Sequence, residues 1–194
     1  AEALGWKVRY TDPTETIRRS WKAAFNKDTW TDGVTYLTIP TGEEFEHHVA
    51  TVYFLNPRGV RIDDASSLRD LSRMKPIRRL QNIMLRNCAG LTNLDALENL
   101  SALRSVLLTK CTVLTNVDAL GNLSALEWVD FTGARELKNI DALRNLSALK
   151  GVGLSGCAAL TNVDALQNHS AVYDINLTGC TGLANVDVLK TLPA

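Results

Sequence analysis

The sequence has no excess of charge of either sign, few aromatic residues and no long apolar run. Its 21 Lys and Arg residues balance 21 Asp and Glu residues, so the formal net charge is zero. A neutral chain lacks the positive potential that gathers nucleic acid or an anionic membrane surface. No apolar stretch approaches the roughly 20 residues that a membrane-spanning helix needs. We therefore expect neither nucleic acid binding nor membrane insertion.

Cysteine is scarce, and the cysteine spacing excludes the common zinc sites. The four cysteines are Cys88, Cys111, Cys157 and Cys180. Zinc ligands usually come in close pairs such as C-x2–4-C, and this chain has none. All four cysteines share one offset of a 23-residue repeat, which Ala134 fills in the remaining turn. Stacked turns about 4.8 Å apart would permit a disulfide. A Cys-or-Ala position is typical of a small buried group, so we predict free thiols.

The main feature that the sequence does have is this repeat. LTNLDALENLSAL (91–103) returns as LTNVDALGNLSAL (114–126), and both segments recur in altered form up to the end of the chain. Five leucines stand 23 residues apart: Leu91, Leu114, Leu137, Leu160 and Leu183. A period between 20 and 29 residues with leucines at fixed offsets is typical of a solenoid. Each turn of a solenoid buries its apolar face only against its neighbours.

Within each repeat the apolar spacing is three, except at one place where it falls to two. Val106 and Leu108 mark that place, and a period of two predicts a short strand over 105–109 with both side chains inward. The steps of three predict tight 3₁₀-like turns on the outer face. Continuing this register in both directions predicts six parallel strands in one curved sheet, around 60–62, 83–85, 106–108, 129–131, 152–154 and 175–177.

Two polar ladders follow the same register. Asn93, Asn116, Asn139, Asn162 and Asn185 share one offset, and Asp95, Asp118, Asp141, Asp164 and Asp187 share the offset two residues later. The Asp precedes Ala-Leu in most repeats, which predicts that its carboxylate caps a short helical turn by accepting free backbone N–H groups.

The repeat resembles a known family. The segment LTNVDALGNLSALEWVDFTGA (114–134) is similar to the leucine-rich repeat, L-x-x-L-x-L-x-x-C/N-x-x-L, and its first half resembles repeats of bacterial internalin-type surface proteins. It departs from those in its 23-residue turn and in carrying Cys where they carry Asn. The resemblance covers about residues 56–194. It implies an α/β, right-handed solenoid that binds macromolecules on a concave, strand-lined face. It implies no catalytic residue, and it favours a secreted or cell-surface bacterial protein.

The first 55 residues do not follow the repeat and are predicted to form an α/β N-terminal cap. Residues 12–15 (DPTE) are a helix start, with Asp as N-cap and Pro at the first helical position, and the helix should end near Asn26. Residues 34–39 and 49–55 are predicted as the two strands of a hairpin. A solenoid needs such a cap because its terminal core would otherwise face water. The predicted boundary between cap and array is at residue 56.

Two apparent chemical motifs have simpler structural interpretations. Residues 151–156 match G-x-G-x-x-G, but they lie on a predicted repeat strand with no long helix after it, unlike a dinucleotide site. Residues 43–48 (EEFEHH) could hold a metal or an acid/base pair, although a solvated loop explains them as well. His169 occupies a leucine position, where we expect a hydrogen-bonded structural histidine. We therefore predict no cofactor, no metal site and no catalytic residue.

The predicted concave face carries the candidate binding residues. Side chains that flank the two inward positions of each strand point to this face. Large apolar groups exposed together on a sheet are typical of contact sites, and charged residues follow them toward the C-terminal half. The candidates are Arg61, Met84, Arg86, Leu107, Trp128, Asp130, Tyr173, Asp174 and Asn176. Residues 58–86 also carry eight Lys and Arg against three Asp, which could seat an acidic partner or simply form a solvated face.

The sequence thus favours a non-enzymatic module that binds another protein through its concave face. One alternative is that residues 1–55 form a small effector or catalytic domain for which the repeats recruit a substrate. Another is that the chain is a structural fragment of a larger surface protein. Leu192 falls at the offset that would open a further turn. An uncovered final turn would favour end-to-end dimerisation.

Overall fold

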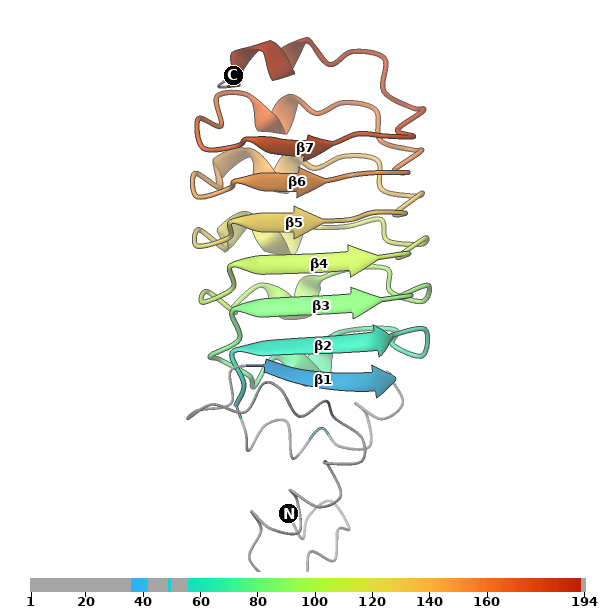
Figure 1. Ribbon diagram of the computed structural model, residues 1–194, viewed down its shortest axis with the longest axis vertical. Helices are drawn as coiled ribbons and strands as arrows, with labels where there is room; N and C mark the ends of the chain where they lie inside the picture. The colour runs from blue at the N-terminus through green and yellow to red at the C-terminus, as the bar shows by residue number, and fades with distance from the viewer. Residues whose placement is uncertain (1–35, 42–48, 50–55, 193–194) are drawn as a thin grey trace, which may run out of the picture.

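The computed structural model describes residues 36–41, 49 and 56–192, and within them the chain forms a stack of short strands and 3₁₀ helices. Figure 1 shows the strands side by side with the helical turns behind them. The strands are β1 (Tyr36–Thr41), β2 (Gly59–Asp64), β3 (Asn82–Arg86), β4 (Ser105–Thr109), β5 (Trp128–Asp130), β6 (Gly151–Gly153) and β7 (Asp174–Asn176). The 3₁₀ helices are η3 (Ser72–Met74), η4 (Asp95–Leu97), η5 (Asp118–Asn122), η6 (Asp141–Asn145), η7 (Asp164–Leu166) and η8 (Asp187–Thr191).

The sheet is parallel, and its strand order follows the sequence from β1 to β7. Each strand pairs with the next one a whole repeat away, as in Val106↔Val129 and Val129↔Val152. This confirms all six strands predicted from the register. The predicted 3₁₀ turns on the opposite side of each coil are confirmed as well.

The core lies between the sheet and the helical turns. Val106 and Leu108 point inward and are fully buried. The leucines that recur every 23 residues, such as Leu114 and Leu137, are fully buried as well. Each buried leucine contributes about 1.5–3 kcal/mol relative to an exposed one, but only when the turns above and below cover it. The repeat therefore stabilises the fold through contacts between neighbouring turns.

The first strand corrects the predicted hairpin. The strand expected at 34–39 is present as β1, but it pairs parallel with β2 and extends the repeat sheet. Val49, expected to begin the second hairpin strand, has helical backbone instead, and residues 50–55 lie outside the described residues. The predicted helix near 12–26 and the cluster at 43–48 also lie outside them. The domain boundary at residue 56 stays a prediction.

The polar ladders are present, but the Asp ladder does not have its predicted capping role. The helical turns that begin with Asp95, Asp118, Asp141, Asp164 and Asp187 have no side-chain cap. Instead, the Asn two residues earlier accepts a hydrogen bond from the Asp backbone N–H, at 2.7 Å between Asn116 Oδ1 and Asp118 N. The same bond recurs in the other four turns. The prediction that Asp caps the turn was wrong; the recurring contact is an Asx-turn, in which the Asn side chain accepts the Asp backbone N–H.

The cysteines behave as two different pairs. Cys88 and Cys111 form a disulfide between neighbouring turns, with their Cα atoms 4.6 Å apart, so the prediction of free thiols was wrong for this pair. Stacked side chains that point the same way remain within disulfide range at that separation. Cys157 and Cys180 are free, as predicted. Burial raises the pKa of the Cys157 thiol to about 12, so this thiol is protonated at neutral pH.

Candidate functional site

Among the described residues, nothing covers one face of the sheet, because the 3₁₀ helices lie on the other (Figure 1). We call it the concave face, after the curvature that the sequence predicts. Strand pairing sets two of its side-chain columns in register. The first column is Gly59, Asn82, Ser105, Trp128, Gly151 and Asp174, and the second is Arg61, Met84, Leu107, Asp130, Gly153 and Asn176. Both columns agree with the prediction.

In the N-terminal half of the face, the two charged candidates, Arg61 and Arg86, both pair with Asp63. Arg61 Nε donates to Asp63 Oδ1 at 2.7 Å, and Arg86 Nη1 lies 3.7 Å from the same oxygen. Met84 and Leu107 lie beside them, half-buried in the second column. Asp63 thus partly neutralises the charge of both arginines, and the charged side chains of this half are ion-paired.

In the C-terminal half, a tryptophan covers a glycine. A Cβ atom at Gly151 would lie 2.1 Å from Trp128 Cζ3, so the indole occupies the space that a side chain on β6 would fill. The Trp128 ring meets Tyr173 edge to face, with ring centroids 5.8 Å apart and planes at 84°. Such a pair contributes about 0.5–1.5 kcal/mol beyond its buried area. Trp128 is therefore held in place from two sides while remaining half-buried.

In the second column, the Asp130 side chain covers Gly153 in the same way. A Cβ atom at Gly153 would lie 2.6 Å from Asp130 Oδ1. The same oxygen accepts hydrogen bonds from the Thr132 backbone N–H at 2.8 Å and from Thr132 Oγ1 at 2.6 Å. On β7, Asn176 Oδ1 accepts a similar bond from the Thr178 N–H at 3.0 Å. These bonds fix the orientation of both side chains above the sheet.

Together these residues surround a shallow depression of about 240 Å³, here called the β5–β7 depression. Gly151 and Gly153 form part of its floor. Leu107, Trp128, Asp130, Thr132, Asp174 and Asn176 line it. Most of this rim was among the residues predicted from the sequence, but the two glycines were not. A Gly-Val-Gly strand beside a Trp-Val-Asp strand could have indicated that large side chains lie over small ones here. Of the other candidates, Tyr173 contacts Trp128, whereas Arg61, Met84 and Arg86 lie apart on β2 and β3.

A charged bridge flanks the depression. Glu127 accepts a hydrogen bond from Lys150 Nζ at 2.5 Å on one carboxylate oxygen and from Arg104 Nη1 at 2.7 Å on the other. Hydrogen bonding to Lys150, supported by Arg104, lowers the pKa of the Glu127 carboxyl. The three residues stand one repeat apart in a single column. Both cations are thereby engaged at the edge of the sheet and away from the depression lining.

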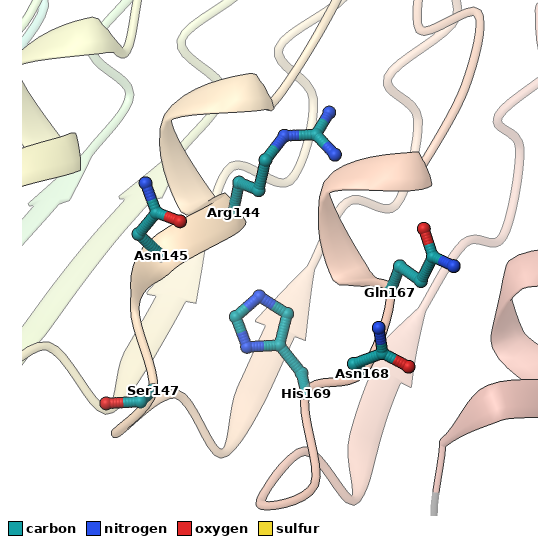
Figure 2. A pocket seen from close by; sticks show the side chains of 6 residues that line it. All are labelled: Arg144, Asn145, Ser147, Gln167, Asn168 and His169. Carbon is teal, nitrogen blue, oxygen red and sulfur yellow. The ribbon is translucent and has the colours of Figure 1, made fainter.

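A second hollow of about 410 Å³ lies outside the sheet, between the turns of η6 and η7. Figure 2 shows its lining: Arg144, Asn145, Ser147, Gln167, Asn168 and His169. His169 is only 6% exposed, and its Nε2 lies 3.0 Å from the Ala165 carbonyl oxygen. This confirms the predicted hydrogen-bonded histidine in a leucine position.

The described ranges (36–41, 49 and 56–192) contain neither a metal-binding cluster nor a helix that could span a membrane. No group of three or more His, Cys, Asp or Glu in these ranges could hold a metal ion. No helix there is both long and apolar enough to cross a membrane. The 43–48 cluster lies outside these ranges, so its proposed acid/base or metal role stays untested.

Comparison with known proteins identifies the fold. Internalin C2 from Listeria monocytogenes str. 4b F2365 is 17% identical, with a TM-score of 0.56 over 84% of this chain and 76% of its own. The leucine-rich repeat domain of the type III effector XopL is 16% identical, with a TM-score of 0.53 over 100% of this chain and 84% of its own. No protein-family model and no curated protein matches the sequence. The chain has the leucine-rich-repeat solenoid fold that the sequence predicts.

Proposed function

We propose that this leucine-rich-repeat scaffold is a non-enzymatic module that binds another protein through its concave face. The observation that carries the proposal is the β5–β7 depression. There, a half-buried Trp128 and an exposed Tyr173 stand together on a rigid sheet. Tyr173 is 71% exposed, and Trp and Tyr are enriched among the residues that dominate binding energy at protein interfaces.

The rigidity of the sheet supports the same proposal. Each strand is fixed to its neighbours by parallel pairing, and Trp128 and Asp130 are each held by contacts with adjacent residues. A surface that is already ordered loses little conformational freedom when a partner binds, so more of the contact energy appears as affinity.

The experiment is a comparative capture of proteins from the source cell extract, with the whole chain as bait. Trp128→Ala removes the aromatic anchor, and Gly151→Ala displaces the indole by placing a methyl group where the ring lies. The control is Gly121→Ala, whose added Cβ would meet nothing closer than 3.5 Å. We expect one protein to be captured by the wild type and the control and to be lost by at least about tenfold in both test variants. Equal capture by all four baits would contradict the proposed face.

Three finer proposals accompany this function. The chain is not an enzyme, and the alternative of an effector domain within residues 1–55 would be favoured only by activity that survives deletion of the repeats. Its setting is secreted or cell-surface, by resemblance to internalin repeats.

End-to-end dimerisation through the last described turn is the third. Ile175, Leu177 and Leu183 are only partly buried, whereas Val152, Leu154 and Leu160 at the same offsets are buried. Sedimentation of the whole chain tests it: a dimer that Leu183→Glu converts to monomer would support this contact, and a monomeric wild type would refute it.

A further inference from the structure

We propose that the β5–β7 depression binds a basic side chain, lysine or arginine, on the surface of the partner protein. Trp128 would contact the cation and its aliphatic stem, while Asp130 and Asp174 would pair with its charge. The inference rests on the proposed function, because it names the chemistry of the partner at the same face.

The size of the depression favours a single side chain over a small-molecule ligand. Its volume of about 240 Å³ lies below the roughly 300–1,000 Å³ of small-molecule pockets. It is also shallow, because its floor is the backbone of β6 at Gly151 and Gly153. A side chain that enters from solvent while its own backbone stays outside fits this shape.

The aromatic rim favours a cation. An indole attracts a positive charge over its face more strongly than any other aromatic side chain, and the attraction grows when the site is partly shielded from water. Trp128 is half-buried, and its contacts with Gly151 and Tyr173 fix the direction that the ring presents. The same ring would cover the methylene groups of a lysine or arginine stem, which are apolar.

The charges that line the depression also favour a cation. Its lining contains two carboxylates, Asp130 and Asp174, and no basic side chain. Both hydrogen bonds that Asp130 accepts within the described part of the chain end on Oδ1, which leaves Oδ2 for a ligand. Asp174 is exposed, and within the described part of the chain its carboxylate makes no hydrogen bond or ion pair, while its backbone N–H donates to the Lys150 carbonyl. Two carboxylates beside an indole can therefore pair with a positively charged ligand.

The surrounding charges do not cancel this preference. Arg104 and Lys150 are both engaged by Glu127 at the sheet edge. The arginines of the N-terminal half, Arg61 and Arg86, share Asp63 on β2 and β3. The concave face is thus basic and ion-paired at one end, and acidic with unpaired carboxylate oxygens at the other. A partner with a basic residue would be aligned by this difference.

The test uses N-acetyl-arginine methylamide as the probe and N-acetyl-citrulline methylamide as its neutral counterpart of the same shape. The whole chain, labelled with ¹⁵N at glycine and tryptophan, is titrated with each probe and followed by NMR. The Gly151 and Gly153 amides and the Trp128 indole N–H report directly on the depression. We expect these signals to shift saturably with the arginine probe, with a dissociation constant in the millimolar range. The citrulline probe should bind at least about fivefold more weakly.

The double variant Asp130→Asn with Asp174→Asn keeps the shape of both side chains and removes their charge. The control, Asp118→Asn with Asp164→Asn, makes the same change in net charge on the helical turns η5 and η7. We expect the first variant to lose about fivefold or more in arginine affinity and the second to lose none. Unchanged amide shifts, without probe, of the glycines away from each substitution establish that each variant is folded.

Each outcome decides the inference. Equal affinity for arginine and citrulline, shifts elsewhere in the chain, or no loss in the first double variant would overturn it. If arginine fails to bind but Trp128→Ala still abolishes capture of a partner, the proposed face stands and only the basic-residue inference falls. If arginine binds but no partner depends on Trp128, the depression recognises cations without serving as the protein-binding face.

Discussion

The two halves of the repeat sheet share one core but differ on the surface. Strands β2, β3 and β4 are six, five and five residues long, whereas β5, β6 and β7 have three residues each. The left-handed position is Asn87 after β3 and Lys110 after β4, and it is glycine at 133, 156 and 179 after β5, β6 and β7. The first half also carries the disulfide, and the second carries the depression.

The inward positions show no such difference, except in the last described turn, where Ile175 and Leu177 are only partly buried. Leu85 and Leu108 in the first half and Leu154 in the second are all fully buried. The repeat therefore keeps the residues that hold neighbouring turns together and varies those that face solvent. Stability belongs to the invariant offsets, and recognition belongs to the columns that change from turn to turn.

The largest effect should come from opening the shared core. Leu108→Ala removes a fully buried side chain between two turns and should cost about 2–5 kcal/mol of unfolding free energy. Leu177→Ala, at a partly buried equivalent in the last described turn, should cost less than half as much. Urea unfolding followed by circular dichroism measures both. Equal costs would mean that the last turn is as well covered as the interior ones.

The two cysteine pairs should differ in both chemistry and stability. Alkylation of the unreduced, unfolded protein should label Cys157 and Cys180 but neither member of the disulfide. Cys88→Ala with Cys111→Ala removes a crosslink that spans 23 residues and should cost about 3 kcal/mol.

The matched control for this comparison is Cys157→Ala with Cys180→Ala, which removes two thiols and no crosslink. It should cost clearly less than the first pair in the same urea measurement. Labelling of Cys88 and Cys111 in the unreduced protein, with no difference between the two double variants, would remove this distinction between the halves.

Substitutions at the left-handed position should change the stability differently in the two halves. Gly156 has φ = 74°, which an L-residue adopts at a cost of about 1–2 kcal/mol, so Gly156→Ala should destabilise by that amount. Lys110 already bears such a cost at φ = 59°, so Lys110→Gly should lower stability little or raise it by up to about 1 kcal/mol. Thermal melting of both variants tests the pair. A destabilising Lys110→Gly of equal size would show that its side chain holds the turn.

The smallest effect concerns the bridge that joins the halves. Because hydrogen bonding to Lys150 lowers the pKa of Glu127 below its ordinary value of 4.5, this carboxylate stabilises the fold above that pH. The contribution disappears as pH falls through the lowered pKa. Melting temperatures of wild type and Glu127→Gln should therefore differ near pH 7 and converge as the pH falls below the lowered pKa of Glu127. A difference that stays constant with pH would exclude the ion pairs as its cause.

Much of the fold could be predicted because the apolar offsets repeat. Val106 and Leu108 identify a strand, and the same spacing recurs in every turn. The sequence predicted β1 as part of a hairpin, although Tyr36 stands one 23-residue period before Gly59 and pairs with it. The register is visible at Leu37 and Ile39. It is lost afterwards, since Gly42 and His48 stand where Ala65 and Leu71 lie in the next turn.

The rest depended on side-chain geometry that spacing does not encode. Cys88 and Cys157 occupy the same offset, each one repeat before another cysteine, yet only the first is paired. Alternation placed Trp128 on the concave face but could not show that its indole lies over Gly151. The contacts of Asp130 with Thr132 were likewise beyond a one-dimensional pattern.

Photo-crosslinking tests the central claim, that the C-terminal half of the concave face is where the partner binds, most directly. A photo-reactive amino acid is placed in turn at Asn176 beside the depression, at Arg86 on the N-terminal half, and at Glu136 outside the sheet. In the extract used for capture, position 176 should yield a crosslinked partner in far higher amount than positions 86 and 136. Crosslinking that is equal at all three positions, or strongest at 136, would contradict the account.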